Sequence, residues 1–103
     1  MEAKDYAAKL RQAQATKTPI SPLRDDIGEY NEELAYAIQQ VNTNHKLVDG
    51  ARIVGKKIGL TSIKVQEQFG ISTPDFGILF DDMEVLNGLS LPISEVMQPK
   101  IEG

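Results

Sequence analysis

The sequence contains no cysteine and no tryptophan, and it has a single histidine, His45. Without cysteine the chain can form no disulfide bond and no thiolate zinc site, and this composition is typical of a reducing compartment. No apolar run approaches the ~20 residues that a membrane-spanning helix needs. The first segment mixes both charge signs, unlike a signal peptide. These absences predict a cytoplasmic protein without a membrane partner.

Positive charge is scarce as well. The chain has 11 Lys and Arg residues against 15 Asp and Glu residues, which gives a formal net charge of −4. The basic residues are scattered, whereas a nucleic-acid-binding protein presents a basic face to the phosphates, so we expect no nucleic-acid partner. A length of 103 residues with 41% hydrophobic side chains indicates one small domain, residues 1–103, with a modest core.

Two helices are predicted in the first half of the chain. Apolar side chains recur at helical spacing from Ala3 to Leu10, which indicates a helix that ends near Ala15. After a proline-containing turn, a second helix is expected between the N-cap Asn31 and the stop signal Gly50. The apolar stripe of the second helix is Leu34, Ile38, Val41, His45 and Val48. We interpret the histidine in this stripe as a partly buried packing residue.

The second half of the sequence changes to strand and turn signals. Residues 52–60 follow a period of two, residues 61–70 indicate a short helix, and residues 76–80 form a short apolar run. Asn87-Gly88 between apolar pairs predicts a tight hairpin. The expected fold class is α+β, with N-terminal helices followed by a small mixed sheet of about three to five short strands, a short helix and a hairpin.

Two further segments carry polar residues. Asp81 and Asp82 are adjacent and are interpreted as a solvated turn. Lys100-Ile101-Glu102 is typical of the start of a strand, yet the sequence stops one residue later, at Gly103. We therefore expect the chain to be part of a longer protein.

Lys57 is the first candidate for chemistry. A strand would place its side chain on the same face as Ile53, Gly55 and Gly59, and the missing side chains would leave a recess beside the ammonium. A lysine there can hold a carboxylate, stabilise an enolate or form a Schiff base. The alternative is an edge-strand lysine that prevents aggregation. Lys56, on the opposite face, is expected to extend to solvent.

Asp75 is the second candidate. It follows Pro74 at a junction between a loop and a strand. A carboxylate there can act as a general base, or it can bond to nearby backbone N–H groups as a turn residue. We expect Lys57 and Asp75 to face one recess large enough for a small oxoacid. Placement on opposite surfaces would instead favour a non-catalytic module.

Five segments occur in an order that is familiar from one family: residues 21–25 (Ser-Pro-Leu-Arg-Asp), 35–39 (Ala-Tyr-Ala-Ile-Gln), 54–61 (Val-Gly-Lys-Lys-Ile-Gly-Leu-Thr), 74–77 (Pro-Asp-Phe-Gly) and 98–102 (Gln-Pro-Lys-Ile-Glu). Together they resemble the N-terminal part of the hydratase/decarboxylase family of meta-cleavage pathways, within the fumarylacetoacetate-hydrolase superfamily. Members include 2-oxopent-4-enoate hydratases and 4-oxalocrotonate decarboxylases. The first two segments are most similar to the pentenoate hydratases.

The resemblance implies roles for three residues. Lys57 matches the family's active-site lysine, Asp75 matches an aspartate suited to proton transfer, and Glu102 matches the first of its metal-binding glutamates. The other glutamates and the β-rich C-terminal catalytic domain would lie beyond this chain. The cofactor implied for the full-length family is Mg²⁺ or Mn²⁺. With one ligand of the set, we expect the 103-residue chain alone to bind no metal and to show no turnover.

The function implied is that of a divalent-metal-dependent 2-hydroxydienoate (2-oxopent-4-enoate) hydratase of aromatic catabolism, acting on a small 2-oxo or 2-hydroxydienoate acid. The metal polarises the enolate, an acid/base group moves a proton, and water adds to the enone. Assembly into a homo-oligomer is compatible with this function. Two alternatives stay open. One is a 4-oxalocrotonate-type decarboxylase domain, and the other is a non-catalytic α+β module that dimerises or binds a partner through its exposed C-terminal strand.

Overall fold

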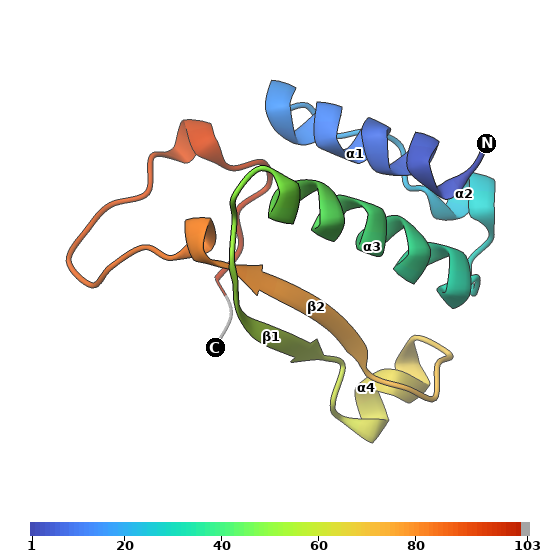
Figure 1. Ribbon diagram of the computed structural model, residues 1–103. Helices are drawn as coiled ribbons and strands as arrows, with labels where there is room; N and C mark the ends of the chain where they lie inside the picture. The colour runs from blue at the N-terminus through green and yellow to red at the C-terminus, as the bar shows by residue number, and fades with distance from the viewer. Residues whose placement is uncertain (102–103) are drawn as a thin grey trace. The chain divides into compact units, whose positions relative to one another are not determined.

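The computed structural model describes residues 1–101 and confirms the α+β class (Figure 1). Contacts between residues divide the chain into two compact units. The helical unit contains Met1–His45 together with the chain from Val85 on, and the ribbon unit is Lys46–Glu84. Each unit is described by itself below.

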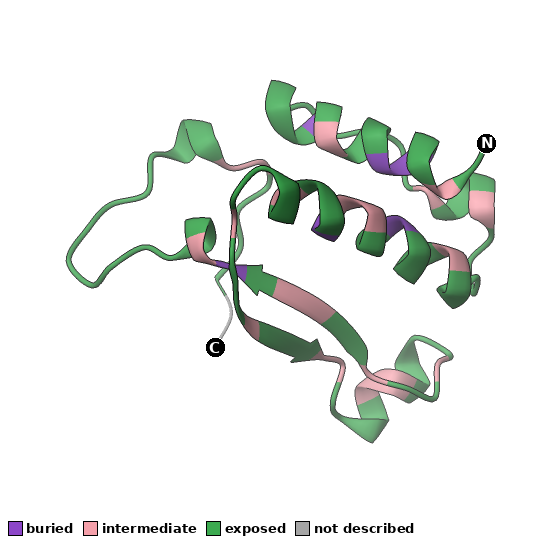
Figure 2. Cartoon of the chain, in the orientation of Figure 1, coloured by how far each residue is buried: buried purple, intermediate pink, exposed green. Residues whose placement is uncertain are grey.

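Three helices build the helical unit: α1 (Ala3–Thr16), α2 (Arg24–Ile27) and α3 (Glu32–Val48), whose last turn lies in the ribbon unit. Its core consists of Tyr6 and Ala7 from α1 and Ile38 from α3, each at most 7% exposed. Figure 2 shows buried positions, in purple, on both α1 and α3. Half-buried hydrophobic side chains pack around the core: Ala3, Leu23, Ile27, Leu34 and Val41. Burial of this apolar surface is the main force that holds the helices together.

Capping groups define the ends of the long helices. The side chain of Asn31 accepts a hydrogen bond from the backbone N–H of Leu34 at 3.2 Å, which satisfies one of the free donors in the first turn of α3. At the other end, Gly50 takes a left-handed φ of 99° and its N–H donates to the carbonyl of Leu47. Asn31 and Gly50 therefore bound α3 as the sequence predicts.

The predicted burial of His45 and Val48 is wrong. His45 is exposed and Val48 is 87% exposed. The Arg11 guanidinium donates to Asn42 Oδ1 at 2.8 Å, so the part of α1 that runs beside His45 is the part after Arg11. That part contains no large apolar side chain. Among the described residues, the apolar stripe of α3 therefore contributes to the helical core only as far as Val41.

The ribbon unit is a two-stranded antiparallel sheet, formed by β1 (Ile53–Gly59) and β2 (Asp75–Phe80) and connected through α4 (Ile63–Gln68). Both strands and the short helix are predicted correctly, but the expected mixed sheet of more strands is wrong. Leu60 leaves β1 with a left-handed φ of 55°, and its carbonyl accepts a hydrogen bond from Gln66 Nε2 at 2.8 Å. This bond fixes the turn from β1 into α4.

The missing strands are those of the predicted hairpin. The turn at Asn87-Gly88 forms, with a φ of 86° at Gly88 and a hydrogen bond from the Leu89 N–H to the Leu86 carbonyl. The residues on either side do not pair as strands. Their large side chains are 45–65% exposed at Val85, Leu86, Leu89 and Leu91. A short isolated hairpin has too little burial to be stable, so only the turn remains.

The end of the described chain is irregular. After two single-turn helices, η1 (Asp81–Met83) and η2 (Ile93–Glu95), Lys100 and Ile101 lie outside any strand, and Ile101 is fully exposed. The strand expected at residues 100–102 is thus not formed by Lys100 and Ile101. Glu102 lies outside the described residues. Within residues 1–101 no helix combines the length and the apolarity required to cross a bilayer.

Candidate active site

Strand register brings Lys57 and Asp75 to the same face of the ribbon. Lys57 is paired with Gly77, and Gly59 is paired with Asp75. Directly paired residues of an antiparallel sheet share a face, so Lys57 and Asp75 are diagonal neighbours on it. Such neighbours lie about 7–8 Å apart at the backbone, within reach of a long side chain. An ammonium and a carboxylate therefore lie on one face, from positions eighteen residues apart in the sequence.

Glycine occupies half of the positions on this face. We call it the glycine face, and it consists of Gly55, Lys57, Gly59, Asp75, Gly77 and Leu79. Lys57 and Asp75 are both exposed, so in residues 1–101 the pair lies on an open surface. A methyl group built on Gly59 or Gly77 would meet no atom within 4 Å, whereas one built on Gly55 would contact Leu79 at 3.7 Å. Among residues 1–101, the space directly above Gly59 and Gly77 is thus open.

The opposite face of the ribbon is apolar. We call it the apolar face, and the register assigns to it Ile53, Lys56, Ile58, Phe76, Ile78 and Phe80. Ile58 and Phe76, paired across the strands, are 56% and 53% exposed. Lys56 is exposed, as expected for a lysine whose charged end reaches solvent.

One prediction about the faces is wrong. Ile53 was expected beside Gly55 and Lys57, but a register shift between Ile53 and Gly55 pairs Ile53 with Phe80 on the apolar face. The extra residue in this irregularity is Val54. A bulge of this kind moves the side chains on its N-terminal side to the opposite face. The side chains on its C-terminal side keep their alternation. The alternation from Gly55 to Gly59, which carries Lys57, is unaffected.

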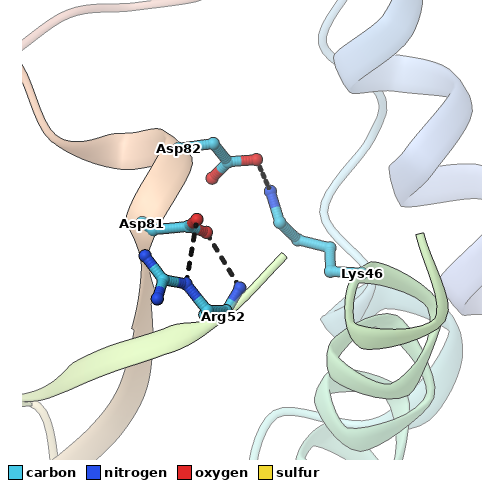
Figure 3. A network of polar contacts seen from close by, with 4 residues as sticks. All are labelled: Lys46, Arg52, Asp81 and Asp82. Atoms are coloured by element: carbon cyan, nitrogen blue, oxygen red, sulfur yellow. Dashed lines mark hydrogen bonds and ion pairs between the residues drawn. The ribbon is translucent and has the colours of Figure 1, made fainter. Parts of the chain in front are cut away.

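A cluster of charged residues closes one end of the ribbon (Figure 3). Lys46 Nζ contacts Asp82 Oδ2 at 2.6 Å, and the same ammonium lies 4.9 Å from the ring centroid of the buried Phe80. The Arg52 N–H donates to Asp81 Oδ1 at 2.9 Å, and Asp81 returns a backbone bond to the Arg52 carbonyl at 2.9 Å. The interpretation of Asp81 and Asp82 as a solvated turn is therefore incomplete, because both carboxylates hold elements together.

The hydrogen bond from the Arg52 backbone is the main reason that the pKa of Asp81 lies below its ordinary value. The Arg52 guanidinium acts in the same direction, with Nε 3.7 Å from Asp81 Oδ2, while partial desolvation opposes both effects. These contacts favour the ionised carboxylate. The ionised Asp81 side chain thus has a structural role, since it binds the backbone and the guanidinium of Arg52 at the end of the ribbon.

Residues 1–101 contain no group of three or more histidine or acidic side chains that could hold a metal ion. Mg²⁺ requires several oxygen ligands in near-octahedral geometry. The described residues therefore do not form a divalent-cation site by themselves. The predicted ligand Glu102 lies outside them, so its assignment stays a prediction.

The position that our sequence reasoning overlooked is Gly77. It occurs in the Pro-Asp-Phe-Gly segment, two residues after Asp75, and it is paired with Lys57. The signal was present in the sequence, since residues two apart on a strand share a face. What the sequence did not contain was the pairing that sets Gly77 opposite the lysine.

Comparison with known proteins connects the chain with a class of enzymes. The chain is 48% identical over 98 residues to a 2-keto-4-pentenoate hydratase of Paraburkholderia xenovorans LB400, covering 95% of this chain and 36% of that protein. Its fold matches 4-oxalocrotonate decarboxylase from Pseudomonas putida G7 complexed with magnesium and adipate. That match has a TM-score of 0.71 at 31% identity and covers 78% of this chain and 30% of the decarboxylase. A structure of the same decarboxylase with calcium and acetate gives a TM-score of 0.72. No protein-family model matches the chain.

The chain is thus a relative of hydratases and of a decarboxylase, and it belongs to the hydratase/decarboxylase family. Within that family its sequence is more similar to the 2-keto-4-pentenoate hydratases than to the decarboxylase of known structure. It spans about a third of the length of the curated relatives that it matches. The resemblance stated from the five sequence segments is confirmed.

Proposed function

We propose that this chain supplies the lysine and the aspartate of the active site of a 2-keto-4-pentenoate hydratase, which adds water to a small 2-hydroxydienoate acid. The observation that carries the proposal is the register of β1 and β2, in which Lys57 and Asp75 share the glycine face. The 48% identity to a named hydratase supports the choice of reaction. The predicted cytoplasmic location agrees with a substrate that is a soluble organic acid.

Lys57 has the charge that this substrate requires. Its ammonium can pair with the carboxylate of the acid or with the enolate oxygen, where negative charge develops as the diene isomerises. Because Gly59 and Gly77, the residues paired with Asp75 and Lys57, carry no side chain, the acid can approach the backbone closely. Lys57 is therefore proposed to bind the acid and to stabilise the developing charge.

Asp75 is proposed to move the proton. Formation of the conjugated ketone removes a proton from the 2-hydroxyl group and delivers one to the far end of the diene, and hydration then adds water to the enone. A carboxylate on the same face as the lysine, at a diagonal position, is placed to take up and return one of these protons.

A divalent ion, in relatives that bind one, supplies a Lewis acid for the oxygens of the substrate. The described residues do not fit such an ion by themselves, so we assign no metal-dependent step to them. We propose Glu102 as one ligand, with the remaining ligands supplied from outside this chain. The 103-residue chain alone is accordingly expected to be inactive.

The test is a chimera in which this chain replaces the matching 98-residue segment of the Paraburkholderia xenovorans hydratase. The chimera is expected to consume 2-hydroxypenta-2,4-dienoate in the presence of Mg²⁺ or Mn²⁺. The reaction is measured as the loss of dienoate absorbance. Lys57→Met should lower kcat/KM by roughly 10²–10³-fold, because it removes a charged group that stabilises the transition state.

Lys56→Met is the matched control, since Lys56 is the next residue on the same strand but lies on the apolar face. Its kcat/KM should stay within about threefold of the parent chimera, as is usual for an exposed substitution away from the site. Equal losses in the two variants, or a folded chimera with no activity beside an active parent hydratase, would overturn the proposal.

A 4-oxalocrotonate-type decarboxylase is the second candidate function, because the solved structure with the matching fold has that activity in its name. The same chimera distinguishes the two only in part, since its remaining residues come from a hydratase. The corresponding segment of the Pseudomonas putida G7 decarboxylase should therefore be exchanged as well. If this chain sustains decarboxylation in that context and fails in the hydratase, the decarboxylase assignment replaces ours.

A further inference from the structure

Nothing in the backbone or packing of residues 1–101 requires glycine at two positions of the glycine face. Gly59 and Gly77 do not adopt the left-handed φ that favours glycine, and a Cβ on either residue would meet no atom of the described chain within 4 Å. Glycine inside a strand is unfavourable, because it loses more backbone freedom on folding and has no side chain to pack. Packing within residues 1–101 therefore gives no reason for the bare backbone at these positions.

The position of these glycines indicates what that requirement is. Gly77 is paired with Lys57, and Gly59 is paired with Asp75, so each charged side chain stands opposite a residue without one. Paired Cβ atoms would lie only about 4.5–5.5 Å apart. A methyl group at residue 77 would thus take up the space directly beside the stem of the lysine.

We propose that Gly59 and Gly77 form the floor of the substrate site and determine which acids it accepts. This inference rests on the function proposed above. A flat, conjugated, unbranched acid can lie against bare backbone between the ammonium and the carboxylate. A branch on the acid would collide with the backbone of the floor. A methyl group added to the floor would likewise occupy the space that the flat acid needs. The floor thus selects planar, unbranched 2-hydroxydienoates.

Gly55 provides a matched control on the same face. A Cβ on Gly55 would make an ordinary contact with Leu79 Cδ1 at 3.7 Å, so it would extend existing packing instead of entering free space. Gly55→Ala, Gly59→Ala and Gly77→Ala are equal in chemistry and lie on the same ribbon. They differ in whether the added methyl group enters the space between Lys57 and Asp75.

The experiment measures three quantities in the hydratase chimera: kcat/KM for the dienoate, the melting temperature, and the Kd of the unreactive acid 2-oxopentanoate by calorimetry. Gly77→Ala and Gly59→Ala should each lower kcat/KM and weaken 2-oxopentanoate binding by about 10–200-fold, the range for one methyl group in a fitted pocket. Their melting temperatures should be unchanged or higher. Gly55→Ala should bind and react as the unsubstituted chimera does.

Two outcomes would overturn the inference while leaving the proposed function intact. If Lys57→Met abolishes activity but Gly77→Ala and Gly59→Ala are normal, the glycines do not limit the substrate. If the two alanine variants melt at lower temperature and bind 2-oxopentanoate normally, the floor is covered by another stretch of backbone and not by ligand. A folded chimera without activity would overturn both the function and the inference.

Discussion

The helical unit and the ribbon unit use their hydrophobic residues differently. In the helical unit, Tyr6, Ala7 and Ile38 are almost completely buried against one another. In the ribbon unit, the apolar pair Ile58 and Phe76 remains more than half exposed. The helices thus obtain their stability from their own core, whereas both faces of the ribbon carry exposed side chains.

The packed core lies in the helical unit, whereas the residues proposed for catalysis, Lys57 and Asp75, lie in the ribbon unit. A two-stranded ribbon is marginal by itself, and here it is supported at one end by the Lys46–Asp82 ion pair and the paired Arg52 and Asp81. Bare positions such as Gly77 weaken it further. The ribbon tolerates these features because the packed core lies in another unit. Three substitutions can break or sharpen this comparison.

The largest effect is expected from Ile38→Ala, which opens a cavity in the helical core. Ile38 is 2% exposed, and truncation of such a side chain costs about 2–5 kcal/mol of unfolding free energy. Ile58→Ala in the ribbon, 56% exposed, is the matched control and should change stability by roughly 0.5 kcal/mol or less. Urea unfolding followed by circular dichroism measures both. Equal losses would mean that the ribbon carries as much of the stability as the helices do.

An intermediate effect is expected from Asn31→Ala. This change removes the acceptor for the Leu34 N–H at the start of α3 and should cost about 1 kcal/mol. Asn31→Ser keeps an oxygen in the capping position and should recover most of the loss. The same urea unfolding experiment applies. An alanine variant as stable as the serine variant would show that the cap does not contribute.

The smallest effect concerns Asp81 and pH. Its pKa is lower in the folded chain than in the unfolded chain, so ionised Asp81 stabilises the fold above about pH 4, the ordinary range of the group. That contribution is lost as the pH falls through the lowered pKa of the folded state. Asp81→Asn should therefore be less stable than the unsubstituted chain at neutral pH, and the difference should shrink in acid.

The carboxyl carbon resonance of Asp81 tests the same point directly. Its NMR titration midpoint in the folded chain should lie below that in the urea-unfolded chain. A midpoint at or above the unfolded value would contradict the role assigned to the hydrogen bond from Arg52.

Local signals explain what the sequence could predict. Asn31 and Gly50 bounded α3 correctly because capping depends on neighbouring backbone groups alone. The period of two identified β1 and β2 for the same reason. Asn87-Gly88 predicted a turn and gave one, but the strands around it needed packing partners that the short segment does not have.

Long-range features could not be predicted in this way. The contact of Lys46 with Asp82 joins residues that are 36 positions apart, and no local pattern indicates it. The shift at Val54 likewise depends on how two strands align. For the candidate site, period two alone placed Lys57 among glycines. Its position on the same face as Asp75 required the register of the second strand.

The shift at Val54 has a consequence for how sequences of this kind can vary in length. Because an extra residue is already absorbed before Gly55, insertions or deletions on the N-terminal side of Val54 can be compensated there without inverting the strand. One residue inserted between Gly55 and Lys56 would instead shift the rest of the strand by one position, so that Lys56 replaced Lys57 opposite Gly77. The tandem lysines would then keep an ammonium on that surface, whereas the order of the glycines around it would be lost.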